Sequence, residues 1–237
     1  MGPDPISCYI SGMCGRFTQL SASLPELDVI VSEESEPERG GRTHYNGAPS
    51  QAFWVIRRNP ETGRYHSDSL FWGLIPHWVK EPGGGRRPIN AKSETVSRLP
   101  SFRAAYAKRR CIVPIANFFE WRKTTPPKQP YAIAMKDGSP FGLAGIWENW
   151  KHPVTDNYIR SFCILTCPAN EMIAAIHDRM PVILPPDAYD RWLSDLEPDP
   201  GNLLAPYPAG AMRMWPISTR VNTPRNDDPS ILDPLED

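Results

Sequence analysis

The stretch RCIVPIANFFEW, residues 110–121, contains two short runs of β-branched and aromatic residues that are typical of buried strands. These runs are Cys111–Pro114 and Phe118–Trp121. Further runs of the same kind, several of them bounded by Pro, Gly or Asp, lie at Ala52–Arg57, Ser69–Leu74, Tyr131–Lys136, Phe141–Trp147 and Tyr158–Thr166. The pattern therefore predicts a fold built mainly from short strands.

Helical patterns are fewer and shorter than the strand patterns. They cover Ser93–Arg98, Phe102–Arg109, Asn170–His177 and Asp187–Leu193, and Ser23 with Glu26 indicates one more helix start. Proline accounts for 28 of the 237 residues and interrupts both helices and central strands. We therefore predict a β-rich α+β fold, with a mixed, largely antiparallel sheet and a few short helices, as a single domain over residues 13–237.

Charge balance and hydrophobic content exclude several classes of protein. The chain has 26 Lys and Arg against 27 Asp and Glu, a net charge of −1, which excludes a uniformly basic nucleic-acid binder but not a local basic face. Hydrophobic residues make up 40%, too much for a disordered chain. No stretch approaches the roughly 18 consecutive apolar residues of a membrane span. We expect a globular protein that does not enter a membrane.

The cysteines indicate a reducing compartment. Their number is odd and their spacing sparse, which does not suggest a disulfide framework. The five are Cys8, Cys14, Cys111, Cys163 and Cys167. The N-terminus also lacks the basic patch and apolar run of a secretory signal. We therefore expect a cytoplasmic protein with reduced thiols.

A second methionine, Met13, directly precedes Cys14. We interpret residues 1–12 as a leader, a tag or a mis-assigned start. Removal of Met13 would make Cys14 an N-terminal 1,2-aminothiol, whose amine pKa is about 7.7–8.0 and whose thiol pKa is about 8.5. Such an amine attacks an aldehyde to give a Schiff base, and the thiol then closes a five-membered thiazolidine ring. The alternative is an ordinary buried cysteine.

Three other polar residues have patterns that suit proton transfer or positioning. Glu120 lies among aromatic residues, where desolvation raises the pKa of a carboxyl group and suits it to acid–base work. His177 follows a short helical pattern and precedes Asp178, so it is a candidate acid, base or phosphate ligand. Asn90 could donate hydrogen bonds to an oxyanion. Each also has an ordinary reading, as a strand residue, a capping histidine or a turn residue.

Basic and aromatic residues together suggest a nucleic-acid surface. Arg103, Lys108, Arg109 and Arg110 form a basic cluster that is either a solvated face or a phosphate track. On the second reading, Trp78 and Trp121 could stack on unpaired bases. The histidines show no ligand spacing, and Cys163 and Cys167 read as core thiols, so we predict neither a metal site nor a cofactor.

An ordered series of motifs resembles the SRAP family (SOS response-associated peptidase). The series runs through MCGRF (13–17), YNGAP (45–49), WGLIPHW (72–78), NAKSET (90–95), RCIVP (110–114), FEW (119–121), GIWE (145–148), IHDRMPV (176–182) and VN (221–222). It spans nearly everything after residue 12, and the order of the motifs makes the resemblance specific.

The resemblance implies a β-rich α+β domain with a positively charged cleft. It also implies an enzyme that binds single-stranded DNA at abasic sites. In the family, the N-terminal cysteine forms a thiazolidine DNA–protein crosslink that shields the lesion, a lyase-like activity. The family name reflects a proposed autoproteolysis that exposes this cysteine. A monomer that acts on DNA without a membrane partner is the family-like expectation.

Roles for individual residues also follow from the resemblance. Cys14 corresponds to the nucleophile, Glu120 to the proton shuttle, His177 to the histidine that assists the sugar chemistry, and Asn90 to the residue that positions Cys14 and the sugar. The positions that correspond to DNA contacts are Arg16, Pro49, Trp78, Lys92, Trp121 and Thr166.

The sequence departs from the family pattern in two ways. The usual Asn-Ala-Arg is Asn90-Ala91-Lys92 here, and lysine lacks the planar fork that binds phosphate in a bidentate manner. In addition, residues 1–13 leave Cys14 with an amide nitrogen, which cannot form a thiazolidine.

Two other functions stay open from the residues. A cysteine peptidase could use an internal Cys14 with His177 or Glu120 as its base. A non-catalytic single-strand binding module would use the aromatic and basic residues alone, and its binding would be independent of Cys14.

Overall fold

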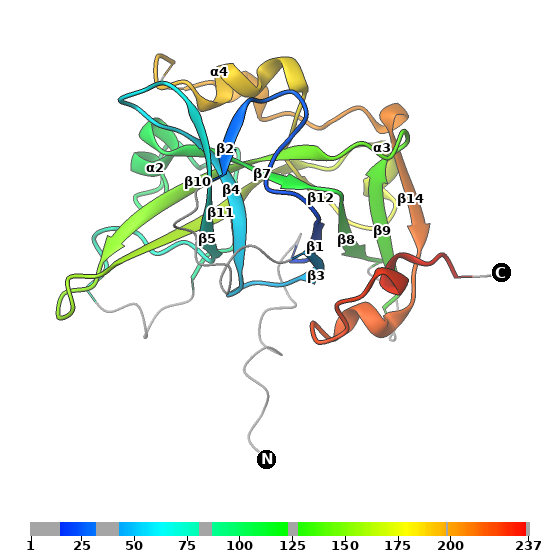
Figure 1. Ribbon diagram of the computed structural model, residues 1–237. Coiled ribbons are helices and arrows are strands. Elements are labelled where there is room, and N and C mark those ends of the chain that lie inside the picture. The colour runs from blue at the N-terminus through cyan, green and yellow to red at the C-terminus, as the bar shows by residue number, and fades with distance from the viewer. Residues whose placement is uncertain (1–14, 32–42, 81–86, 123–127, 198, 236–237) are drawn as a thin grey trace.

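The predicted strands form, and most extend by one to several residues beyond the predicted runs. The structure, a computed structural model, describes residues 15–31, 43–80, 87–122, 128–197 and 199–235 (Figure 1). Cys14 and residues 1–12 lie outside this part. The RCIVPIANFFEW stretch forms β7 (Arg110–Ile115) and β8 (Asn117–Trp121), and only Ala116 separates them. The two strands nevertheless belong to different sheets.

Five strands close into a barrel. They are β4 (Ala52–Arg58), β5 (Tyr65–Trp72), β7, β10 (Phe141–Lys151) and β11 (Tyr158–Pro168). Antiparallel pairing joins β5 to β4, β4 to β7, β7 to β10 and β10 to β11. A parallel pairing of Ser161 with Phe71 and Phe162 with Trp72 joins β11 to β5 and completes the ring. Closure leaves these strands without a free edge at the junction.

Four short strands extend the barrel. The strand β2 (Val29–Val31) pairs in parallel with β5, and β13 (Ile183–Leu184) pairs with β10. The other two flank the end of β11: β6 (Asn90–Lys92) runs parallel to it and β12 (Arg179–Pro181) runs antiparallel. The predicted Asn90 and His177 motifs are therefore neighbours of the same strand.

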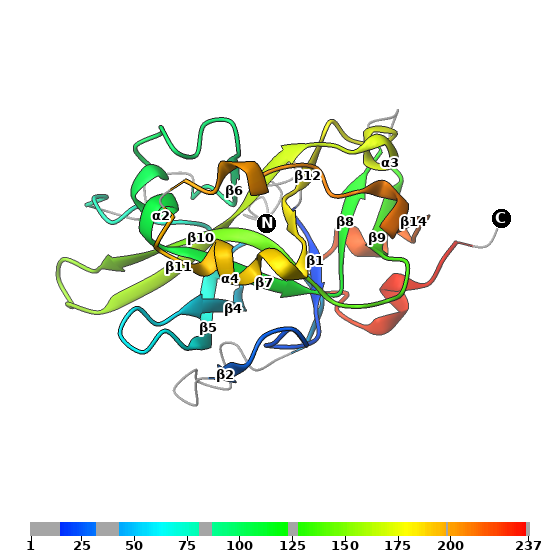
Figure 2. The same ribbon diagram turned by 90° about the horizontal axis from the view of Figure 1, so that it is seen from above.

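A second, wholly antiparallel sheet lies beside the barrel. Its order is β14 (Met212–Pro216), β9 (Pro130–Met135), β8, β1 (Phe17–Gln19) and β3 (His44–Gly47). Figures 1 and 2 both show β8, β9 and β14 to the right of the barrel strands. The mixed, largely antiparallel pairing predicted from the sequence is confirmed.

Helices are few and short, as predicted. In the described part of the chain they are α2 (Arg103–Lys108), α3 (Glu171–Ala174) and α4 (Tyr189–Leu193), and 3-10 turns lie at Pro186–Ala188, Gly201–Leu203, Ala209–Ala211, Thr219–Asn222 and Pro229–Leu232. In this order, the 3-10 turns are labelled η2, η3, η4, η5 and η6. Figure 2 shows α2 and α4 over the barrel strands.

Two predicted helical segments are wrong. Residues 93–98 form consecutive turns instead of a helix, because Ser93 is still bonded to β11 through Thr166 and the segment ends at Leu99-Pro100. The predicted helix start at Ser23 is also a turn, because only a few residues separate it from β2.

Aromatic side chains join the two sheets. Phe17 of β1 lies 4.5 Å from Phe53 and 4.8 Å from Trp72, measured between ring centroids. Trp72 in turn stacks on Phe162 of β11 at 6.3 Å. All four side chains are buried. The described part of the chain contains no helix long and apolar enough to cross a membrane.

Candidate functional site

The first described residues run alongside β8, the strand that carries Glu120. Phe17 pairs with Phe118, and the amide of Phe119 donates a hydrogen bond of 3.0 Å to the carbonyl of Arg16. Glu120 is therefore the next residue after Phe119, which is hydrogen-bonded to Arg16. Arg16 is two residues after Cys14 in the sequence. Cys14 itself lies outside the described residues.

Glu120 is buried in the middle of the second sheet. Its exposed fraction is 3%, and it pairs across the sheet with Tyr131 of β9. The neighbouring Phe119 is fully buried, whereas Trp121 is half-buried and donates its indole N–H to Asn222 Oδ1 at 2.8 Å. The burial agrees with the desolvated carboxyl group expected from the aromatic context.

Arg16 fastens the C-terminal turns to the first strand. Its guanidinium donates to Asn46 Oδ1 at 3.0 Å, to the Val221 carbonyl at 2.5 Å and to the Asn222 carbonyl at 3.1 Å. Burial lowers the pKa of Arg16 to about 10, so the group stays charged at neutral pH. Arg16 was predicted as a DNA contact from the resemblance. The structure adds a structural role, and the DNA contact stays a prediction.

Asn46 is a positioning residue that the sequence reasoning missed. Its amide Nδ2 donates to the carbonyls of Val221, Thr223 and Asn226 at 3.1, 3.1 and 2.9 Å. In the sequence, Asn46 belongs to the YNGAP motif and its partner Val221 to the VN motif. Neither motif indicates that the two residues bind each other. Together, Arg16 and Asn46 hold η5 against β1 and β3.

The NAKSET segment lies against the end of β11. Asn90 is half-buried and Lys92 is exposed, and they pair with Ile164 and Thr166. Thr166 is fully buried, and its hydroxyl contacts the Ala91 carbonyl at 3.4 Å. The predicted DNA contact by Thr166 would thus have to come from the surface beside it, where Lys92 lies.

His177 follows α3, which is capped by Asn170 through a 3.0 Å bond from the Ile173 amide. The side chain of His177 is 13% exposed. Its Nδ1 accepts the Arg179 amide N–H at 3.1 Å, which in the neutral imidazole leaves the proton on Nε2. The Asp178 carboxylate lies 3.2 Å from the same nitrogen and would stabilise the protonated ring. These contacts fix the position of the ring, and its part in proton transfer stays a prediction.

An ion pair ties the His177 motif to the Asn90 motif. Arg179 forms a bidentate pair with Glu94, one of whose bonds is 2.9 Å, and also donates to the Thr166 carbonyl at 2.6 Å. The guanidinium holds the pKa of Glu94 down at about 2. The two motifs therefore form a clamp across β11.

The site residues fall into two groups that share a connection. Glu120 and Trp121 belong to the second sheet, and Arg16 directly precedes its strand β1. Thr166 lies near the end of β11, and Asn90, Lys92 and His177 lie beside it. Trp72 links the groups, because its ring packs on Phe17 and its indole N–H donates to the Ile89 carbonyl at 3.0 Å. Trp72 therefore contacts both Phe17, which follows Arg16, and Ile89, which precedes Asn90.

Trp78 and Pro49 lie outside these groups. The Trp78 ring is 56% exposed and lines a cavity of about 480 Å³ with His77, Pro100, Arg103 and Ala104. Pro49 is half-buried in the turn before β4, where the next residue, Ser50, has a φ of 71°. An exposed indole beside an arginine is suited to stack on a base.

The basic cluster predicted from the sequence separates in the structure. Arg110 is buried and donates to the carbonyls of Trp192, Tyr106 and Glu197 at 2.7, 2.9 and 2.8 Å, so it is part neither of a solvated face nor of an exposed phosphate track. Arg103, by contrast, is exposed beside Trp78.

The described cysteines are core residues, as predicted. Cys111, Cys163 and Cys167 are fully buried and form no disulfide. Burial raises the pKa of all three thiols, that of Cys167 to about 12. None of them is suited to act as a nucleophile at neutral pH. Among the described residues, no group of three or more His, Cys, Asp or Glu side chains could hold a metal ion.

Comparison with known proteins matches this arrangement to one family. The family model described as SOS response associated peptidase (SRAP) matches residues 13–224. The chain belongs to the SRAP family. It is 37% identical to the Bacillus subtilis abasic site processing protein YoqW, over 93% of this chain and 99% of that protein. It is 30% identical to the Escherichia coli abasic site processing protein YedK, over 94% of this chain and 100% of that protein.

A solved structure supports the fold. A crystal structure of a protein from Bacteroides thetaiotaomicron superposes with a TM-score of 0.74 at 29% identity, covering 81% of this chain and 86% of that chain. The predicted family and the β-rich fold of this SRAP protein are therefore confirmed. The positively charged cleft and the roles of the individual site residues stay predictions.

Proposed function

We propose that this SRAP protein binds single-stranded DNA at abasic sites and forms a thiazolidine crosslink through Cys14, after removal of residues 1–13. The observation that carries the proposal is the near full-length similarity to proteins named for abasic site processing. The first residue matched by the family model is Met13, directly before Cys14, which supports a mature chain that begins at Cys14.

The surroundings of the chain after Cys14 support the chemistry. Gly15 alone separates Cys14 from Arg16, whose carbonyl is bonded to the Phe119 amide. Two peptide units allow at most about 7.6 Å between the α-carbons of Cys14 and Arg16. The buried carboxyl group of Glu120, next to Phe119, is therefore a suitable proton donor and acceptor for chemistry at Cys14.

The reaction requires two bonds to the aldehyde carbon of the ring-opened deoxyribose. The α-amine of Cys14 attacks that carbon, and loss of one water gives the imine. The thiol sulfur then adds to the same carbon while the thiol proton passes to the imine nitrogen, which closes the ring. Glu120 moves protons during ring opening and loss of water, and His177 assists at the sugar oxygen. Asn90 positions the amine and the sugar.

Self-processing would supply the terminal amine. The family is described as a peptidase, which favours autoproteolysis before Cys14 as a second activity of this site. The thiol of Cys14, with Glu120 or His177 as base, is the candidate nucleophile. A Cys14→Ala variant of the chain that begins at Met1 should then retain residues 1–13, whereas the wild-type chain should lose them.

A matched variant separates the amine from the thiol. In a chain that begins at residue 14, Cys14→Ser keeps the α-amine but removes the sulfur. We expect it to form an adduct with abasic single-stranded DNA only when borohydride reduces the imine, whereas the wild type forms a stable adduct without a reductant. A stable adduct of Cys14→Ser without borohydride would contradict the thiazolidine.

A further inference from the structure

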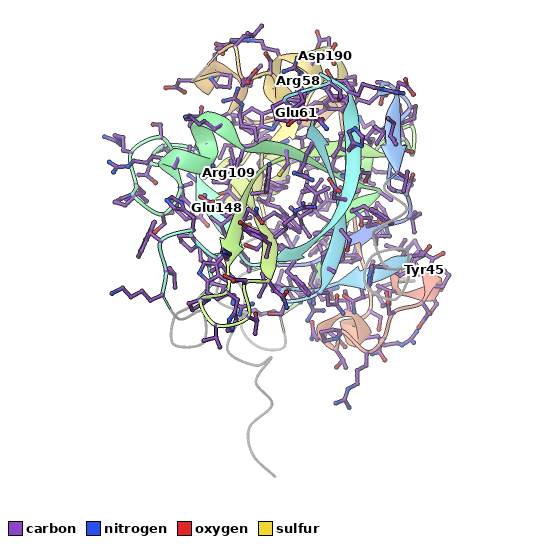
Figure 3. The ribbon with its side chains drawn as sticks, turned by 60° about the vertical axis from the view of Figure 1, so that its left-hand side comes forward. Tyr45, Arg58, Glu61, Arg109, Glu148 and Asp190 are labelled. Carbon is purple, nitrogen blue, oxygen red and sulfur yellow. The ribbon has the colours of Figure 1, made fainter. Side chains whose placement is uncertain are left out.

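A second cavity lies on the barrel, and Lys108, Arg109 and Arg110 of the basic cluster are among the residues that line it. Its volume is about 490 Å³, within the range of small-molecule sites. Its lining residues come from β4, β5, α2, the start of β7, β10, β11 and the segment after α4; the charged ones are Arg57, Arg58, Asp68, Lys108, Arg109, Arg110, Arg160 and Asp195. Figure 3 shows Arg58 and Arg109 on this face, with Tyr45 of β3 well apart from them.

Cations outnumber carboxylates around this cavity. Arg57 pairs with Asp68, Arg58 with Asp195 at 3.2 Å, and Arg109 with Glu148 at 2.8 Å. Arg160 reaches only the already paired Asp68, at 3.9 Å. Lys108 has no ion-pair partner within the described residues. Arg110 is buried and its guanidinium is bound to backbone carbonyls, so it does not count toward this charge. The other five Lys and Arg side chains face three carboxylates, and the surplus favours an anionic ligand.

Two of these cations, Arg57 and Arg109, are held in place without a ligand. The Arg57 guanidinium lies 4.2 Å from the centre of the Trp147 ring while it pairs with Asp68. Arg109 is fixed by Glu148, which is 2% exposed, and Figure 3 shows the two residues side by side. The Nε of Arg109 is buried and has no hydrogen-bond partner among the residues described. Such prior ordering reduces the entropy lost on binding.

The chemistry of the lining favours a phosphate over a base. Arginine side chains bind phosphate oxygens through their planar N–H groups. The Trp147 ring is already covered by Arg57, so its stacked face is not free for a base. The cavity therefore suits recognition of a backbone without regard to sequence.

We propose that this cavity binds a phosphate of the single-stranded DNA beyond the lesion. The inference rests on the proposed function, because it extends the footprint of the same strand. Arg160 precedes Thr166 by six residues on β11, at most about 20 Å along an extended strand. At 3.4 Å per stacked nucleotide, this distance corresponds to about six nucleotides.

The test removes two exposed charges of the cavity. Lys108→Gln together with Arg160→Gln changes side chains that are exposed, so the fold should persist. The matched control is Lys136→Gln with Arg213→Gln, which removes the same charge from the exposed face of the second sheet. Fluorescence anisotropy would measure the Kd for a lesion-free single strand at several salt concentrations. Strands of two lengths are needed, one well beyond about six nucleotides on each side and one too short to reach the cavity.

For the long strand, we expect the cavity variant to bind more weakly than the control. Its plot of log Kd against log salt concentration should be shallower by about 0.7 to 1.4, the value for one or two lost phosphate contacts. The short strand should bind both variants equally. Equal Kd and equal slope for the two variants on the long strand would overturn the inference. Binding of a deoxynucleoside monophosphate to both variants would be measured as well. If the cavity variant lost this binding while its Kd for the long strand stayed equal to that of the control, the cavity would be a site for a free anion, and the inference would also be overturned.

The outcome is separable from the proposed function. The binding assay uses strands without a lesion, so it does not depend on crosslinking. If the cavity variant weakens long-strand binding while no form of the protein crosslinks an abasic site, the proposed function fails and the phosphate site stands. If crosslinking succeeds and the cavity variant binds like the control, the phosphate site fails alone.

Discussion

The guanidinium of Arg16 donates a hydrogen bond to the carbonyl of Val221, a residue 205 positions further along the chain. Arg16 lies just before β1, and Val221 lies in η5, one of the last turns of the fold. The bond therefore joins the beginning of the described chain to one of its last turns. The position of Arg16 depends on the C-terminal turns as well as on β1.

Arg16→Lys should destabilise the protein, although the charge is retained. Lysine lacks the planar fork that reaches Asn46, Val221 and Asn222 together. Without the guanidinium, the Asn46 Oδ1 and the Asn222 carbonyl lose their donor, whereas the Val221 carbonyl keeps the bond from Asn46 Nδ2. Leaving a buried acceptor unpaired costs roughly 1–3 kcal/mol, and we expect a loss of that size in the free energy of unfolding, measured by urea denaturation. Arg213→Lys, at an exposed residue, is the control. An unchanged free energy of unfolding for Arg16→Lys would show that the bonds carry no net stability.

The Glu94–Arg179 pair should make stability sensitive to acid. The folded pKa of Glu94 is about 2, below its ordinary value of 4.5. The unfolded chain therefore takes up a proton first as the pH falls. The stabilisation is complete above about pH 4.5 and is lost as the pH falls through about 2.

Glu94→Gln removes this acid-dependent component and is the direct test. The difference in unfolding free energy between wild type and Glu94→Gln should shrink as the pH falls from 5 to 2, and it should be modest because Glu94 is half exposed. Glu61→Gln, on an exposed turn, should show no such trend. A difference that stays constant with pH would contradict the assigned pairing.

Trp78→Ala should weaken single-strand binding and leave stability nearly unchanged. The ring is 56% exposed, so little packing is lost, whereas stacking on a base contributes about 1–3 kcal/mol. Anisotropy with a lesion-free strand would measure the loss as a rise in Kd of roughly 5- to 150-fold. Tyr158→Ala is a suitable control, because this ring is also exposed, at 61%, but lies on the β10–β11 hairpin. Equal effects of the two variants would remove Trp78 from the binding surface.

The three core thiols should resist modification in the folded protein. Cys111, Cys163 and Cys167 are fully buried, and their raised pKa values keep them protonated at neutral pH. Alkylation followed by peptide mass mapping should leave these residues unmodified until denaturant is added. Rapid labelling of Cys163 in the native state would show that the barrel opens more readily than its packing indicates.

The strands were predictable because their signals are local. Runs such as Phe141–Trp147 combine apolar and β-branched residues between turn residues, and the structure extends this run to Lys151. Barrel closure had no such signal. It depends on the parallel pairing of Phe71 with Ser161, which are far apart in sequence and carry no pattern that specifies each other.

The site was predictable in its residues but not in its contacts. Arg16 and Arg110 both lie in motifs that carry the resemblance. Their burial and their bonds to carbonyls follow only from the three-dimensional packing. A sequence read locally counts an arginine as a surface charge. Asn46 and Glu94 were missed for the same reason, because their partners, Val221 and Arg179, lie on other elements.

The central claim concerns the terminal amine and thiol of Cys14, and intact mass spectrometry tests it most directly. Two forms, one that begins at Met1 and is kept unprocessed and one that begins at Cys14, would be mixed with single-stranded DNA that contains one abasic site. We predict an adduct, with loss of one water, only for the form that begins at Cys14, and no adduct after Cys14→Ala. An adduct of equal yield with Cys14 still internal, or none with either form, would contradict the account.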